Sequence, residues 1–169
     1  MTEQGRDPDA ILARYVDGPA QLEGAIAGLA ETDLDLAQSA DTWTIRQLVH
    51  HVVDGDDIWK VCIKAALGNS GGAFSLQWYW ELEQDTWVER WDYAGRAIAP
   101  SLALFRANRL HVVQLMERNS DGWERHMRIQ WPHQPEEERI TVGDVIEMQA
   151  NHVTYHIDDI RAIRQSHSI

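Results

Sequence analysis

The spacing of apolar residues is the feature that most constrains the fold of this chain. In the segments 8–30, 45–67, 100–120 and 142–164, apolar side chains recur mostly at steps of three and four residues. This period places them on one face of an α-helix. The pattern therefore predicts four amphipathic helices, each with one face turned toward a common core.

Local signals indicate where these helices begin, end and bend. Two threonines are each followed three residues later by a residue that completes a capping box, in the pairs Thr44 with Gln47 and Thr141 with Asp144. The second helix should therefore start near residue 45, and the last near residue 142. The glycine-rich segment 68–72 should end the second helix, and Gly18-Pro19 is expected to kink the first.

The segments between the predicted helices differ in character. Segment 77–91 is rich in tryptophan and reads as short helical pieces, whereas Pro132 and Pro135 forbid a continuous helix over 123–139, where only 127–129 is expected to be extended. We predict an all-α fold in a single domain over residues 1–169. It is a four-helix bundle, expected to be antiparallel, with a long irregular connection before the last helix.

Composition excludes several classes of function. The net charge is −12 and no Lys/Arg cluster occurs, so the chain lacks the basic surface that nucleic-acid binding requires. No apolar run approaches the roughly 20 residues that cross a bilayer, so no membrane partner is expected. The segment 1–9 is polar and acidic, unlike a signal peptide, and Cys62 is the only cysteine. These features predict a cytoplasmic protein in which Cys62 is a core residue.

The apolar face of the last predicted helix contains three polar residues, Gln149, His152 and His156. Burying a polar side chain without a partner costs on the order of 1–3 kcal/mol, so these residues need partners. Histidines at i and i+4 can both approach one metal ion at about 2.0–2.1 Å. Core histidines that are hydrogen-bonded to other protein groups are the alternative, and these two residues alone do not decide between them.

The adjacent pair His50-His51 in the second predicted helix favours the metal site. At about 100° per residue, His51 borders the apolar face, whereas His50 lies nearly opposite to it. Gly55, one turn from His51, could leave space beside the imidazole. Three histidines from two helices would leave a metal position open, as in catalytic zinc sites. A fourth ligand would instead close the site, and the candidates for it are Asp54, Asp56 and Gln149.

Two motifs resemble those of the DinB-like superfamily of metalloproteins. They are the run 43–54, WTIRQLVHHVVD, and the run 152–160, HVTYHIDDI. The resemblance is closest to the subgroup of metal-dependent hydrolases and thiol S-transferases. It implies an up-down-down-up four-helix bundle, often a homodimer, with a divalent ion such as zinc or nickel on His51, His152 and His156. Gly55-Asp56 stands where this subgroup commonly has Ser-His, so the resemblance does not assign a particular substrate to this chain.

The chemistry of such a site leaves the reaction open. A three-histidine metal can lower the pKa of bound water toward about 7 or hold a thiol as thiolate. We therefore expect a thiol S-transferase that activates a low-molecular-weight thiol cosubstrate, such as bacillithiol or mycothiol, toward a small-molecule substrate. A metal-dependent hydrolase is one alternative. A non-enzymatic bundle that binds a metal or small ligand is the other.

Several residues around the predicted site have weaker assignments. Asp54 and Asp159 could orient ligand imidazoles, and Tyr155 could donate a hydrogen bond near the metal, although solvated carboxylates and a packing tyrosine are the commoner cases. Four tryptophans cluster between the second and third predicted helices: Trp78, Trp80, Trp87 and Trp91. They are expected to cover the end of the bundle or to lie in a dimer interface, and the alternative is that they form a wall of the substrate pocket. No role is assigned to the remaining histidines, His111, His126, His133 and His167.

Overall fold

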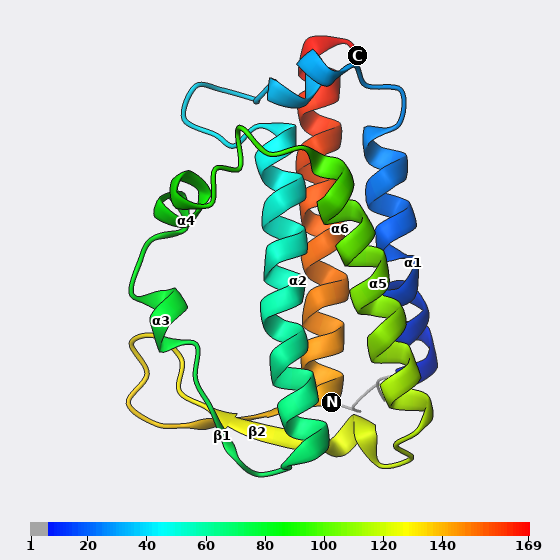
Figure 1. Cartoon of the computed structure of the whole chain (residues 1–169), viewed down its shortest axis with the longest axis vertical. Helices are drawn as coiled ribbons and strands as arrows, with labels where there is room; N and C mark the ends of the chain where they lie inside the picture. The colour runs from blue at the N-terminus through cyan, green and yellow to red at the C-terminus, as the bar shows by residue number, and fades with distance from the viewer. Residues whose placement is uncertain (1–6) are drawn as a thin grey trace, which may run out of the picture.

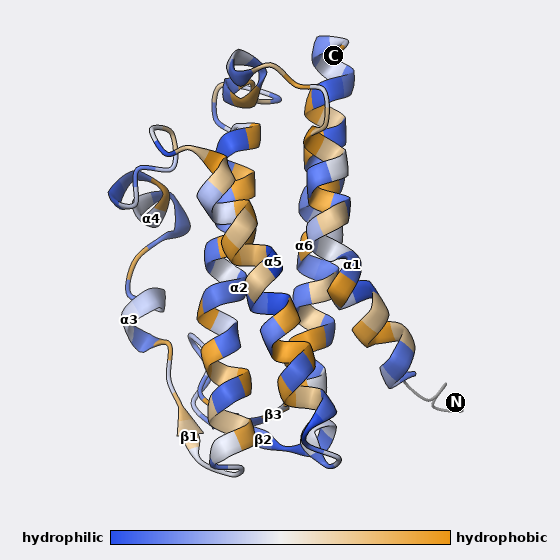
Figure 2. Cartoon of the chain, turned by 45° about the vertical axis from the view of Figure 1, so that its right-hand side comes forward, coloured by the Kyte–Doolittle hydropathy of each residue, from blue (hydrophilic) through white to orange (hydrophobic). Residues whose placement is uncertain are grey.

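A bundle of four long helices forms the body of the molecule, as predicted. The computed structural model describes residues 7–169, so residues 1–6 of the polar N-terminal segment lie outside the described residues. The bundle helices are α1 (Pro8–Ile26), α2 (Ile45–Gly68), α5 (Ile98–Glu117) and α6 (Val142–His167). Hydrophobic and hydrophilic residues share each of these helices (Figure 2). The predicted all-α class and the predicted four-helix bundle are confirmed. The helices also have the amphipathic character from which both were predicted.

The order of helix directions is up, down, down and up (Figure 1). α2 and α5 run parallel because residues 69–97, which we call the crossover, return the chain along the length of the bundle. The crossover contains β1 (Ala73–Phe74), α3 (Gln77–Trp80) and α4 (Gln84–Arg90), so the predicted short helical pieces are confirmed. The antiparallel arrangement inferred from helix order alone is wrong for α2 and α5. The topology implied by the family resemblance is found instead.

The connection before α6 is more regular than predicted. After a short 3₁₀ turn, η2 (Gly122–Glu124), the strands β2 (His126–Ile129) and β3 (Glu138–Thr141) pair antiparallel. β1 of the crossover adds to β2 in parallel, giving the strand order β1-β2-β3. The extended piece expected at 127–129 is confirmed. The other two strands were missed: β1 is only two residues long, and β3 (ERIT) begins with two charged residues.

Local capping sets the helix starts that the sequence predicted. In both α2 and α6 the N-cap threonine accepts the backbone N–H of the third residue, whose side chain accepts the threonine N–H in return. α1 ends at Ile26, earlier than expected, and the 3₁₀ helix η1 (Glu31–Asp35) follows it. No helix in the described part, residues 7–169, is long and apolar enough to span a membrane.

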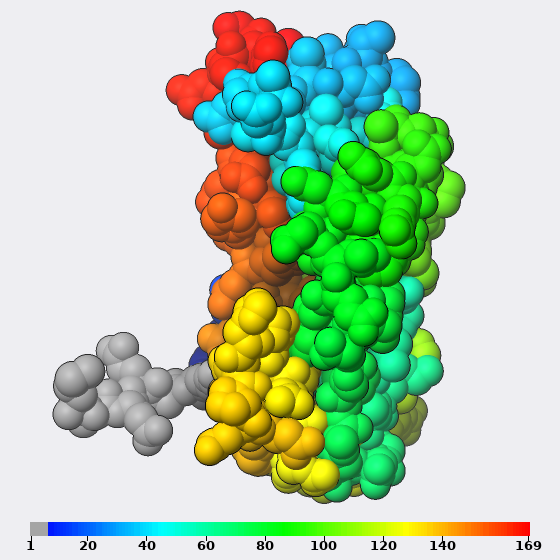
Figure 3. Space-filling view, turned by 90° about the vertical axis from the view of Figure 1, so that its left-hand side faces the viewer, coloured from blue at the N-terminus to red at the C-terminus, as the bar shows by residue number. Residues whose placement is uncertain are grey.

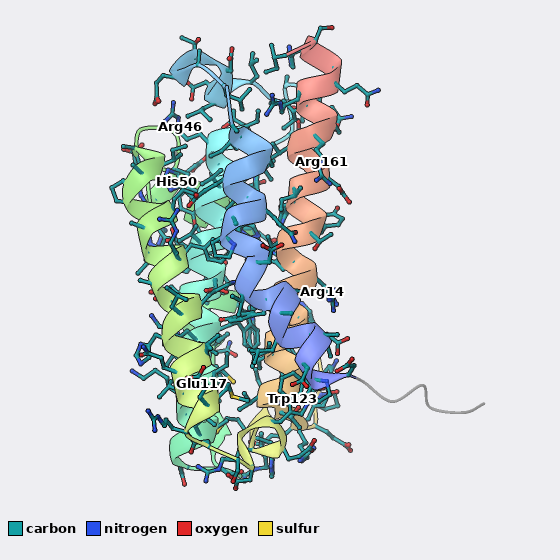
Figure 4. The ribbon with its side chains drawn as sticks, turned by 90° about the vertical axis from the view of Figure 1, so that its right-hand side faces the viewer. Arg14, Arg46, His50, Glu117, Trp123 and Arg161 are labelled. Atoms are coloured by element: carbon teal, nitrogen blue, oxygen red, sulfur yellow. The ribbon has the colours of Figure 1, made fainter. Side chains whose placement is uncertain are left out.

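α2 packs against both α5 and α6, which corrects the placement of His50. This side chain is fully buried, its Nδ1 lies 2.9 Å from Ser101 Oγ, and its Nε2 lies 3.2 Å from the carbonyl oxygen of Arg96. The helical-wheel placement opposite the core was wrong because α5 covers that second flank of α2; His50 is labelled in Figure 4. His50 is a satisfied core histidine that faces away from the predicted metal site.

α1 passes through Gly18-Pro19 with the predicted bend, and Figure 4 shows it changing direction about halfway along. Pro19 has no N–H to donate to the carbonyl of Tyr15. The buried guanidinium of Arg109, on α5, donates to that carbonyl instead. A Cβ on Gly18 would lie 3.2 Å from Arg109 Cζ and nearer still to its Nη1. The Gly-Pro pair therefore supplies both the space and an acceptor for a buried arginine.

Candidate metal centre

The three predicted histidines converge where α2 faces α6. His152 Nε2 lies 3.1 Å from His51 Nε2 and 3.1 Å from His156 Nε2. One nitrogen from each of the three residues falls within 4.8 Å of the others. The i, i+4 spacing on α6 brings two rings onto one face, and the packing of α2 against α6 brings the third. The structure thus brings together all three residues predicted as metal ligands.

Hydrogen bonding among the imidazoles does not account for this geometry. His152 Nε2 is either a donor or an acceptor in the neutral ring, so only one of its two 3.1 Å contacts can be a good hydrogen bond. A shared cation would make both contacts favourable. Two nitrogens on a tetrahedral ion at about 2.0–2.1 Å lie about 3.3–3.4 Å apart. The observed spacing is close to that value, so the three residues fit a metal ion.

The environment keeps these imidazoles neutral, which is the form that binds metals. Burial, followed by the proximity of the other two histidines, lowers the pKa of His51 to about 3. Burial, followed by His156 and the charge of Arg109, lowers the pKa of His152 to about 4. Burial also lowers the pKa of His156, although Asp159 opposes this shift. At neutral pH the lone pairs of all three rings are available.

Of the residues predicted to orient the histidine rings or to lie near the metal, Asp159 and Tyr155 contact His156, whereas Asp54 is paired with an arginine. Asp159 Oδ2 lies 3.0 Å from His156 Nδ1, so it can accept the Nδ1–H and leave Nε2 free. Asp54 instead accepts a hydrogen bond from Arg96 at 3.0 Å. Tyr155 is 66% exposed and packs edge-on against the His156 ring. Of the two carboxylates, the one on α6 is placed to set the tautomer of a histidine in the cluster.

No carboxylate closes the cluster. Within residues 7–169, the group of potential metal ligands consists of the three histidines and includes no Asp, Glu or Cys. Asp56 points instead to Arg109, whose Nε and Nη2 each lie 3.1 Å from Asp56 Oδ1. Gln149 is buried beside the cluster and lines the same cavity as His152. Within the described residues, therefore, no further ionisable side chain joins the three histidines, and a fourth coordination position is left open.

A cavity of about 310 Å³ opens onto two of the histidines. Figure 3 shows the face on which the surface is hollowed between α6 and the crossover. The cavity combines imidazole, amide, phenol and apolar groups, which suits an organic ligand held beside a reactive centre. Its lining comes from α2, α6 and the crossover: His51, Gly55, Ile58, Trp59, Tyr79, Gln84, Met148, Gln149 and His152.

A second cavity, of about 300 Å³, reaches the cluster from the direction of the C-terminal half of α6. Its lining includes Trp43, Tyr155, His156 and Asp159. A further cavity of about 560 Å³ lies between α2 and the crossover, and none of the three histidines lines it. Two separate spaces therefore contact the candidate metal site, and they contact different histidines.

The crossover contributes site residues that sequence reasoning missed. Tyr79 donates to Gln84 Oε1 at 2.8 Å, and both side chains line the first cavity. Asp85 accepts the indole N–H of Trp43 at 2.7 Å, which fixes the Trp43 ring edge-on to His51. No periodic pattern links the crossover to α2. Trp43 lies in the quoted motif, just before the helix cap, whereas the roles of Tyr79, Gln84 and Asp85 depend on tertiary contacts.

The tryptophans of the crossover do not close an end of the bundle. Trp78 and Trp91 line the cavity of about 560 Å³, and the Trp87 indole N–H donates to the Tyr79 carbonyl at 2.8 Å. Trp80 packs against Trp131, beyond β2. Trp78 and Trp91 therefore form part of a cavity wall, but none of the three histidines lines that cavity, so their place in a substrate pocket or a dimer interface stays a prediction.

Cys62 has the inert environment of a core residue. Its side chain is buried in the apolar core, and burial raises the pKa of the thiol to about 12. A thiol with such a pKa is not ionised at neutral pH, so Cys62 is not a nucleophile in the folded protein.

Comparisons with known proteins agree with this description. The model of the DinB superfamily matches residues 14–160. A protein of Oceanobacillus iheyensis, named "Putative metal-dependent hydrolase OB0782", is 25% identical over 147 residues, which are 87% of this chain and 80% of that protein. The solved structure of YfiT from Bacillus subtilis, described as "a probable metal-dependent hydrolase with an unusual four-helix bundle topology", has a TM-score of 0.82. The match covers 99% of this chain and 93% of that chain at 20% identity, and it shows a common fold.

Proposed function

Because this chain belongs to the DinB superfamily, we propose that it is a metal-dependent hydrolase of a small-molecule substrate. The observation that carries the proposal is the convergence of three neutral imidazoles beside a cavity, with no carboxylate of residues 7–169 in the cluster. The names of the two similar proteins, each described as a metal-dependent hydrolase, support the same reaction class. An open position distinguishes a reactive centre from a structural metal site.

Each residue has a defined part in this proposal. His51, His152 and His156 would hold a divalent ion, and we propose zinc or nickel because imidazole suits both. The bound metal would act as a Lewis acid and lower the pKa of water toward about 7. Asp159 would accept the Nδ1–H of His156 and so fix the tautomer of that ring. In the first cavity, the apolar groups exclude bulk water while the Tyr79 phenol and the Gln149 amide offer polar contacts to the substrate.

Thiol transfer is the second candidate, and the presence of two cavities favours it. One cavity contacts His51 and His152, and the other contacts His156. A transferase needs room for a low-molecular-weight thiol and for an electrophile at the same centre, whereas hydrolysis needs room for one substrate and water. The metal would hold the thiol as thiolate.

Metal analysis tests the shared premise first. We expect about one divalent ion per chain in wild type, measured by plasma mass spectrometry, and its loss in His152→Ala. His111→Ala is the matched control, because His111 is an exposed histidine on α5; it should retain the metal. Absence of metal from wild-type protein, even after incubation with zinc or nickel, would refute both reactions.

Turnover then separates the two reactions. The metal-loaded protein should hydrolyse an activated ester such as p-nitrophenyl acetate, and chelation should abolish the rate. Conjugation of 1-chloro-2,4-dinitrobenzene with cysteine, above the uncatalysed rate, would instead support the transferase. A metal-loaded protein that catalyses neither type of reaction over a broad set of esters, amides and electrophiles would favour the non-enzymatic binding alternative.

A further inference from the structure

Three buried side-chain atoms of the described residues have no hydrogen-bond partner: Asp56 Oδ2, Gln149 Oε1 and His152 Nδ1. An unpartnered buried polar atom costs about 1–3 kcal/mol, and native proteins contain few of them. His152 faces the other histidines through Nε2, so its Nδ1 is not part of the cluster, and the cluster includes neither Asp56 nor Gln149. Each of the three atoms therefore needs a partner that the described side chains and backbone do not supply.

The three residues belong to one layer of the bundle. Arg109 holds Asp56 through Nε and Nη2, and its Nη2 donates to the carbonyl of Gln149 at 3.0 Å. Gln149 precedes His152 by one turn on the same face of α6. On α2, Gly55 is adjacent to Asp56, and a Cβ on Gly55 would lie 3.5 Å from His152 Cε1, the ring atom between Nδ1 and Nε2. The missing side chain of Gly55 thus brings the α2 backbone next to the edge of the His152 ring.

The chemistry of the three atoms is complementary to one water molecule. With Nε2 directed at the metal position, His152 carries its proton on Nδ1 and is a donor there. Asp56 Oδ2 and Gln149 Oε1 are both acceptors. A water can accept one hydrogen bond and donate two, and buried waters typically make about three. A direct bond between any two of these atoms is not formed.

We propose that one buried water accepts the His152 Nδ1–H and donates to Asp56 Oδ2 and Gln149 Oε1, which makes Asp56 a positioning residue for the His152 imidazole. Through this water, the carboxylate fixes the tautomer of His152 and the direction of its Nε2 lone pair, a role that carboxylates in metal sites often fill by direct contact. Arg109 in turn holds the carboxylate in place. The donor role of His152 Nδ1 and the positioning role rest on the proposed metal site, whereas the presence of a water beside the three atoms rests on their burial without a protein partner.

A crystal structure of the metal-free wild-type protein, prepared with chelator, tests the water directly. We expect an ordered water within about 3.2 Å of both Asp56 Oδ2 and His152 Nδ1. Density that shows no water there, or a direct contact between the carboxylate and the ring, would overturn the proposal. Because this measurement needs neither bound metal nor turnover, it can fail while the proposed function stands.

Metal affinity tests the positioning role. Asp56→Asn keeps the size of the side chain but removes the charge, and we expect its zinc affinity, measured by competition with a chromophoric chelator, to fall about 10–100-fold. Asp57→Asn is the matched control, because Asp57 binds Lys60 and Asn108 rather than Arg109; its affinity should equal that of wild type. Equal affinities in folded Asp56→Asn and Asp57→Asn would refute the role. If Asp56→Asn does not fold, the wild-type crystal structure still decides whether the water exists.

Discussion

Replacing Gly18 by alanine should destabilise the protein, which reverses the usual effect of this substitution inside a helix. Alanine is favoured over glycine in a helix interior by about 1 kcal/mol. At this position, however, the new Cβ would lie 3.2 Å from Cζ of Arg109 and well inside van der Waals contact with Nη1. The guanidinium is almost completely buried, so it has no solvent-filled space into which to move.

The magnitude follows from what the guanidinium would lose. Overpacking a core typically costs about 1–3 kcal/mol. Displacing Arg109 would also weaken its contact with Asp56, and breaking a buried ion pair costs about 3–5 kcal/mol. Even a partial displacement therefore outweighs the gain in helix propensity. We expect a net loss of about 2 kcal/mol or more, which for a chain of this length lowers Tm by about 4–8 °C.

Urea denaturation and thermal unfolding of Gly18→Ala measure this effect. Gly24→Ala is the matched control, because Gly24 also lies in α1 and a Cβ there meets no atom within 4 Å. It should be as stable as wild type or slightly more stable. If Gly18→Ala matched or exceeded the stability of wild type at an unchanged m-value, the close packing of Arg109 against α1 would be refuted.

Three further predictions concern the site and the core. Asp159→Asn should weaken zinc binding about 10-fold because it removes the charged partner of His156, whereas Asp158→Asn, next to it on the solvent side, should not; equal effects in a chelator competition would contradict this. The metal-free protein should lose stability as the pH falls from about 6.5 toward 4, because histidines of the unfolded chain take up protons that folded His51 and His152, with their lowered pKa values, do not. Thermal unfolding in chelator should show a smaller loss of stability over this pH range in His51→Gln than in wild type. An identical loss would refute the lowered pKa of His51. Cys62 should react with a disulfide reagent only after denaturant is added, as its raised pKa and burial require; rapid labelling of native protein would contradict its place in the core.

Features encoded within one helical turn were predictable from the sequence. The starts of α2 and α6 follow from threonine caps that act over three residues. The pairing of His152 with His156 follows from the period of a single helix. His51 required a second helix, and its direction could be inferred because the apolar face of α2 reports where the core lies.

Features that depend on how helices pack were not predictable in the same way. His50 is buried because α5 covers a flank of α2 that the helical wheel assigned to solvent. The sequence pattern predicted a bend at Gly18-Pro19 but not its partner, because Arg109 lies far along the chain, on α5. The contributions of Tyr79 and Asp85 were missed for the same reason: the crossover reaches the site through tertiary contacts alone.

The crossover separates two kinds of evolutionary constraint. All three candidate metal ligands lie on α2 and α6, whereas the crossover contributes Tyr79 and Gln84 to the first cavity and six of the ten residues that line the cavity of about 560 Å³. Mutations in the crossover can reshape what enters the cavities without altering the spacing of the histidines. A lineage built on this topology can therefore vary its cavities while it keeps the histidine cluster, and relatives should differ most in the segment between α2 and α5.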